Sequence, residues 1–166
     1  MDFRCQTNKR LHEEHAASLS LLARLERAVS GRSCAYPPAA QDREWQACAG
    51  AVLAAIDVEV ARHFDFEERE LFPRLEQSGD GDLAALLAEE HVTIRAVAQR
   101  LAELLRDALG GGLAPPQWQT LKTLALEFSE RLAAHAQKED GALLPVLEQL
   151  LDEETDRALF GAYASG

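Results

Sequence analysis

The sequence predicts an all-α protein, an antiparallel up-down-up-down four-helix bundle with a short C-terminal helix. Three observations support this fold class. Ala, Leu, Glu and Arg are frequent while β-branched residues are scarce, a composition that favours helices. Four long stretches carry apolar residues at helical spacing and end at runs rich in Gly, Pro or Asp. The two halves of the chain also repeat one pattern of His and Glu residues.

Four helices can be placed in order along the chain. A linker containing Pro37 and Pro38 ends the first, the run SGDGD ends the second, and the run GGGLAPP ends the third. A short last helix is expected from Asp152, which can cap it, to Tyr163. Helices of this length with short connections pack as antiparallel neighbours. The four predicted spans are about residues 7–29, 41–77, 83–109 and 117–150.

Length and charge limit the class of protein. The 166 residues predict one domain, residues 1–166. The formal net charge of −11 argues against nucleic acid or an anionic membrane surface as a partner. The three cysteines, Cys5, Cys34 and Cys48, form no C-x-x-C pair, and the N-terminus has no apolar run typical of a signal peptide. We therefore expect free thiols and a cytoplasmic location.

A repeat divides the chain into two similar halves. Residues 63–76 read HFDFEERELFPRLE and residues 135–148 read HAQKEDGALLPVLE, with His, Glu, Leu, Pro, Leu and Glu at the same offsets. The triplet Glu-Glu-His precedes each of them, at residues 13–15 and 89–91. Each half is therefore predicted to be one helical hairpin, with a histidine on its first helix and an H-x-x-x-E motif on its second.

The hairpins are expected to span about residues 7–77 and 83–150. Pro73 and Pro145 occupy equivalent places in the repeat. Each lies inside a predicted helix, where proline removes a backbone hydrogen bond and clashes with the preceding turn. We therefore expect each proline to kink or break its helix.

Four histidines and two glutamates are predicted to point into the bundle. At about 100° per residue, each histidine lies within about 40° of apolar residues on its helix, and each glutamate lies about 40° further on. A single histidine on an apolar face is usually an ordinary core residue. A buried carboxylate, however, costs several kcal/mol unless it is paired or binds a metal. The sequence therefore predicts a metal site whose ligands are His15, His63, Glu67, His91, His135 and Glu139.

Six ligands are too many for one tetrahedral zinc ion. They suit two metal ions, each bound by two histidines, with both glutamates as bridges. Mixed nitrogen and oxygen ligands favour iron, with manganese or zinc possible. Four protein donors per ion leave positions for an oxo or hydroxo bridge and for a small ligand such as dioxygen or nitric oxide.

These residues resemble the haemerythrin-like, or HHE cation-binding, domain over about residues 10–150. The resemblance implies a four-helix bundle around a non-haem di-iron site, with the four histidines as terminal ligands and Glu67 and Glu139 as bridges. Oxygen-carrying haemerythrins have H-x-x-x-H on the third helix, whereas Arg95 follows His91 here. The symmetric set is more similar to the di-iron branch that repairs iron–sulfur clusters and responds to nitric oxide.

Other classes of protein fit less well. A ferritin-like oxidase would use E-x-x-H, which the sequence lacks. A phosphotransfer bundle could use His135 and Lys138, but its histidine must be exposed. A structural zinc bundle remains an alternative to a protein that binds or senses dioxygen or nitric oxide, or handles iron. His12, Glu59 and Glu70 lie near the predicted site, and the sequence leaves their roles open.

Overall fold

The computed structural model describes residues 3–31, 35–39 and 41–165, without the side chain of Glu59. Every regular element in these ranges is a helix, which confirms the predicted all-α class. Cys34 and the Glu59 side chain, both considered above, lie outside the described residues. The elements are α1 (Gln6–Ser30), α2 (Arg43–Ala54), η1 (Ala55–Val60), α3 (Ala61–Phe66), η2 (Glu67–Leu71), α4 (Phe72–Ser78), α5 (Gly81–Gly110), α6 (Pro115–Lys138), η3 (Glu139–Leu143), α7 (Leu144–Leu150) and α8 (Glu153–Ser165).

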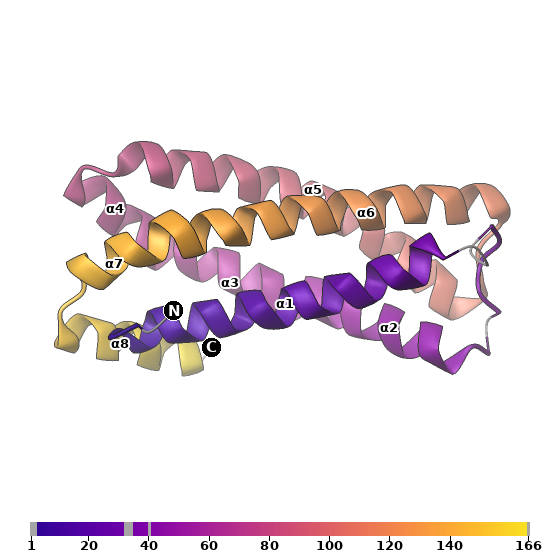
Figure 1. Cartoon of the computed structure of the whole chain (residues 1–166), viewed down its shortest axis with the longest axis horizontal. Helices are drawn as coiled ribbons and strands as arrows, with labels where there is room; N and C mark the ends of the chain where they lie inside the picture. The colour runs from indigo at the N-terminus through magenta and orange to yellow at the C-terminus, as the bar shows by residue number, and fades with distance from the viewer. Residues whose placement is uncertain (1–2, 32–34, 40, 166) are drawn as a thin grey trace.

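The helices form four long rods and one short one (Figure 1). The first rod is α1, the second runs from α2 to α4, the third is α5, and the fourth runs from α6 to α7. Consecutive rods run in opposite directions along the long axis (Figure 1). The short helix α8 lies beside the N-terminal half of α1, so both ends of the chain meet at one end of the bundle (Figure 1).

Local residue chemistry explains where the rods begin and end. Asp42 caps α2 by accepting hydrogen bonds from the backbone N–H groups of Glu44 and Trp45, at 3.0 and 3.1 Å. Asp152 accepts from the N–H of Thr155 at 2.8 Å at the start of α8, as predicted. Gly79 ends α4 with φ of 101°, a conformation that glycine adopts without a steric penalty.

The two prolines inside the rods do not end them. Each of these two rods instead has a π-helical turn, η2 or η3, that ends two residues before the proline. The N–H groups of Phe72 and Leu144 reach back five residues, to the carbonyls of Glu67 and Glu139. This wider turn leaves room for the proline ring, so the expected break takes the form of a π turn. The sequence shows the prolines but not this way of accommodating them.

Two apolar cores fill the bundle, one on each side of a polar layer. One includes Leu22, Trp45, Ile94 and Trp118, and the other includes Leu11, Leu71, Leu87 and Leu143. On α1 and α5 a buried histidine lies between residues of the two cores. None of the helices in the described ranges has the length and apolar character needed to cross a membrane.

Candidate metal centre

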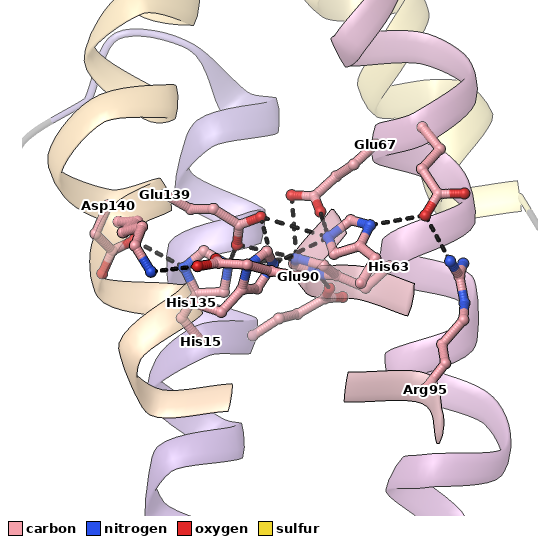
Figure 2. A network of polar contacts seen from close by, with 12 residues as sticks. His15, His63, Glu67, Glu90, Arg95, His135, Glu139 and Asp140 are labelled. Atoms are coloured by element: carbon pink, nitrogen blue, oxygen red, sulfur yellow. Dashed lines mark hydrogen bonds and ion pairs between the residues drawn. The ribbon is translucent and has the colours of Figure 1, made fainter. Parts of the chain in front are cut away.

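The polar layer contains all six side chains that the sequence singles out. They come from four rods, with His15 on α1, His63 on α3 and Glu67 on η2, His91 on α5, and His135 on α6 followed by Glu139 on η3. Their side chains converge between the helices (Figure 2). Both glutamates are 0% exposed, and the most exposed of the four histidines is only 7% exposed. The six side chains, called the candidate ligands below, therefore share one buried site.

The Nε2 atoms of the four histidines face the two carboxylates. Oxygens of Glu139 lie 3.0 Å from His15, 3.9 Å from His63, 3.9 Å from His91 and 2.8 Å from His135. Glu67 reaches two of them, at 3.2 Å from His63 and 3.4 Å from His91.

The candidate ligands fall into two sets of four, which share both glutamates. One set has the histidine pair His15 and His63, and the other has the pair His91 and His135. Within each set, the four ligand atoms lie within 4.8 Å of one another. This spacing is compatible with one cation at the centre of each set and with two bridging carboxylates.

The buried carboxylates lack conventional partners. Among the described residues, none donates a hydrogen bond of suitable geometry to any of the four oxygens of Glu67 and Glu139. No Lys or Arg of the described ranges pairs with either group. Leaving such charges buried and unpaired costs several kcal/mol. A bound cation removes this cost, so the donor set fits a metal.

A carboxylate outside the site holds each histidine by its other ring nitrogen. The Nδ1 atoms of His15, His63, His91 and His135 lie 2.8, 3.0, 2.8 and 3.0 Å from their partners. These partners, called the outer carboxylates below, are respectively Asp140, Glu14, Glu68 and Glu90. An ionised carboxylate only accepts, so each Nδ1 carries the proton and donates it. In a neutral ring, Nε2 then presents a lone pair to the centre.

These lone pairs approach each other closely. The two Nε2 atoms lie 3.3 Å apart in the His15–His63 pair and 2.9 Å apart in the His91–His135 pair. Two lone pairs at that distance repel each other unless a proton or a metal ion lies near both. The arrangement therefore calls for positive charge at two places, one for each histidine pair.

Without a metal, protons supply part of this charge. Burial by itself lowers the pKa of His15, His63 and His91. Nearby carboxylates outweigh burial: Glu139 and Glu67 raise the pKa of His91 to about 9 and also that of His63, and Glu139 and Asp140 raise that of His15. Burial would raise the pKa of Glu139, but the surrounding histidines hold it well below its usual range. A metal must displace these protons when it binds.

The outer carboxylates are held in turn by basic groups. Glu68 accepts from Arg95, and Glu90 accepts from Lys138. Glu14 is held by Arg10 and Arg62, each at 2.9 Å. Arg95, placed where oxygen carriers have a histidine, therefore supports the site from outside (Figure 2).

Asp140 is held differently, by a histidine. His12 Nδ1 lies 2.9 Å from Asp140, whose other oxygen accepts from His15. His12 therefore lies outside the candidate ligands and contacts one of their partners. Glu70 was, with Glu59, another candidate for such a role. Its carboxylate lies 3.5 Å from Arg74, and Glu68 of the same π-helical turn is the residue that holds a histidine by its Nδ1 atom.

A cavity of about 200 Å³ opens beside the first pair of histidines. His15, His63 and His135 line it, as do Arg10 and Arg62. The rest of the wall is mostly apolar, formed by residues such as Leu19, Val60, Leu132 and Ala136. A small ligand can therefore approach this part of the site.

In the second pair His135 lines this cavity, but His91 is covered by aromatic rings instead. The Phe64 ring stacks on His91, with 3.7 Å between the ring centroids and 8° between the planes. The Phe72 ring also stacks on His91, with 5.4 Å between the ring centroids. His91 is 0% exposed and does not line the cavity. The two histidine pairs thus differ in access: both histidines of the first line the cavity, whereas in the second His135 does and His91 does not.

The family model of the Hemerythrin HHE cation binding domain matches residues 6–156. The chain belongs to this family. The match covers nearly the whole haemerythrin-like chain and includes all six candidate ligands. A search of curated proteins found no match to it. Family membership and the buried His and Glu clusters together indicate a metal-binding protein.

Sequence reasoning did not identify the outer carboxylates of this haemerythrin-like site. A signal for them was present in the repeat. Glu14 and Glu90 each stand directly before a candidate ligand, and Glu68 and Asp140 each stand directly after one. Acidic residues at equivalent places in both halves are what histidine ligands need for orientation, so aligning the halves residue by residue would have found them.

Proposed function

We propose that this haemerythrin-like protein binds two iron ions and uses them to bind dioxygen or nitric oxide. In this proposal each ion takes two histidines, and Glu67 and Glu139 bridge the ions. The observation that carries it is the pair of buried carboxylates without hydrogen-bond donors, facing four Nε2 atoms that are oriented by outer carboxylates. Mixed nitrogen and oxygen donors with open positions suit non-haem iron.

The cavity supports a small ligand at the His15–His63 ion. Its volume of about 200 Å³ and its largely apolar wall suit a diatomic molecule better than a large polar substrate. The site therefore favours binding or sensing over catalysis on a metabolite. Two divalent ions and two carboxylates also leave positive charge, so a small anion such as azide is a suitable probe.

The test is elemental analysis of protein purified without oxygen, together with an optical spectrum before and after exposure to air or nitric oxide. We expect two iron ions per chain and a new absorption band with either gas. His63→Ala should lower both the iron content and the melting temperature, because a metal that binds only the folded state stabilises it. One zinc ion per chain and no iron would refute the proposal and favour a structural zinc bundle.

A further inference from the structure

The short helix α8 brings one buried tyrosine to the edge of the metal centre. Tyr163 is 4% exposed, and its ring lies 4.4 Å from that of Phe66, measured between centroids. The guanidinium of Arg62 lies 4.6 Å from the centre of the tyrosine ring. Tyr163 also lies beyond residue 156, where the family match ends. Its place beside the site is therefore a feature of this chain that family membership does not assign.

The tyrosine hydroxyl points at an outer carboxylate. It donates a hydrogen bond to Glu14 Oε2, the same oxygen that accepts from His63 Nδ1 at 3.0 Å. Burial, and then the bond to Glu14, raise the pKa of Tyr163, so the phenol keeps its proton and remains a donor. Tyr163, Glu14 and His63 thus form one line of hydrogen bonds that ends at a candidate ligand.

Contacts at the start of α8 fix this line. Asp156 accepts from the backbone N–H groups of Gln6 and Thr7, at 2.7 and 3.0 Å, and so caps α1 from another helix. Asp156, Leu159 and Tyr163 are the buried residues of α8, and their spacing places them on one face of the helix. The helix is therefore held to α1 near its beginning by Asp156 and near its end by Tyr163.

The other half of the site is built differently. Glu90, which stands where Glu14 stands in the repeat, is held by Lys138 and by His135. Among the described residues no tyrosine contacts it, since the chain has only two tyrosines and Tyr36 is 72% exposed. The tyrosine contact therefore concerns one histidine pair and not the other.

We propose that Tyr163 is a positioning residue for the metal ion bound by His15 and His63. By holding Glu14, its hydroxyl fixes the tautomer and the ring orientation of His63, which raises the affinity for that ion alone. Groups that orient a ligand in this way typically contribute about 10–100-fold to metal affinity. The inference rests on the proposed two-metal site and adds to it a contribution from α8.

The test compares Tyr163→Phe with Tyr36→Phe, a control that removes the same hydroxyl at an exposed position. Each variant is loaded with Fe(II) without oxygen, and the release of both ions to a chelator is followed over time. We expect Tyr163→Phe to weaken one of the two ions by about 10–100-fold and to leave the other unchanged. Melting of the metal-free variant should match that of the Tyr36→Phe control, since the ring and its packing remain.

A double-variant cycle separates positioning from a general structural effect. If Tyr163 acts through Glu14, adding Tyr163→Phe to Glu14→Gln should weaken the ion little further. Release of both ions at the parental rates, or equal weakening of both, would overturn the inference, as would full additivity in the cycle. A parent protein that binds fewer than two ions would instead refute the proposed function on which the inference rests.

Discussion

The two histidine pairs are alike in how they face the buried carboxylates and different in what surrounds them. In both, the histidines come from two rods, and each Nδ1 donates to an outer carboxylate at 2.8 to 3.0 Å. Yet both histidines of the His15–His63 pair line the cavity, whereas in the other pair His135 lines it and aromatic rings cover His91. The repeat thus supplies equivalent candidate ligands without supplying equivalent access.

The two halves of the repeat carry different residues next to the candidate ligands, and these account for the difference in access. Phe64 follows His63, lines the cavity and stacks on His91, whereas its counterpart after His135 is the much smaller Ala136, which also lines the cavity. Ser18, three residues after His15, also lines the cavity, and its counterpart Ile94 is buried in the apolar core. Small residues on one side and large residues on the other therefore decide where a ligand can enter.

The largest expected effect comes from Glu139, the one carboxylate that both pairs share fully. Its oxygens lie within 3.9 Å of all four Nε2 atoms, whereas Glu67 is close to only two of the histidines. Glu139→Gln should therefore abolish binding at both positions, a greater loss than the roughly 10–100-fold caused by removing an orienting group. Calorimetric titration with Fe(II) measures it. The control is Glu130→Gln, which makes the same substitution at an exposed residue of α6. Two ions retained by Glu139→Gln would contradict the prediction.

The second prediction tests the difference in access. Ala136→Phe places in the second half the residue found at the equivalent position of the first, Phe64, and it should fill much of the cavity. We expect azide or nitric oxide to bind the loaded protein about tenfold more slowly, which corresponds to about 1.4 kcal/mol on the barrier. Stopped-flow absorbance measures the rate, and iron content should remain at two per chain.

A matched control for Ala136→Phe is Leu126→Phe, which adds a ring at a position of the same helix that is 45% exposed. Equal binding rates in both variants would show that ligands do not enter through the cavity.

The converse change, Phe64→Ala, should expose His91 to ligands. It should also destabilise the fold by about 3–5 kcal/mol, because Phe64 is fully buried.

Part of the fold and of the site could be predicted from the sequence. Helical spacing predicted the rods, and the repeat predicted which residues would meet, because four faces with one buried histidine each can meet only inside a bundle. The π turns before Pro73 and Pro145 were not foreseen, since the sequence shows the proline but not the turn that accommodates it. Access to the site was not foreseen either, because the packing of Phe64 on His91 joins residues of different rods.

The third prediction concerns pH and the metal-free protein. The carboxylates raise the pKa of His91 to about 9, above its value of about 6.5 in an unfolded chain. Stability from this group is therefore fully present below pH 6.5 and is lost as pH rises towards 9, by up to about 3 kcal/mol. Unfolding in urea with a chelator present, at several pH values, measures it. Metal affinity should instead increase over the same range, because the metal displaces protons.

The smallest expected effect comes from His12, the residue that distinguishes the support of His15 from that of the other three histidines. Arginine or lysine holds each of the other outer carboxylates, whereas His12 holds Asp140, at 2.9 Å. His12→Ala removes this contact but leaves Asp140 bonded to His15, so both ions should remain bound, with the one at His15 weakened by less than about tenfold. His15→Ala removes a candidate ligand and should release that ion entirely. Elemental analysis and chelator competition on the two variants compare them. If His12→Ala empties the site while His15→Ala leaves it filled, the assignment of the α1 ligand is wrong, and His12 and His15 exchange roles.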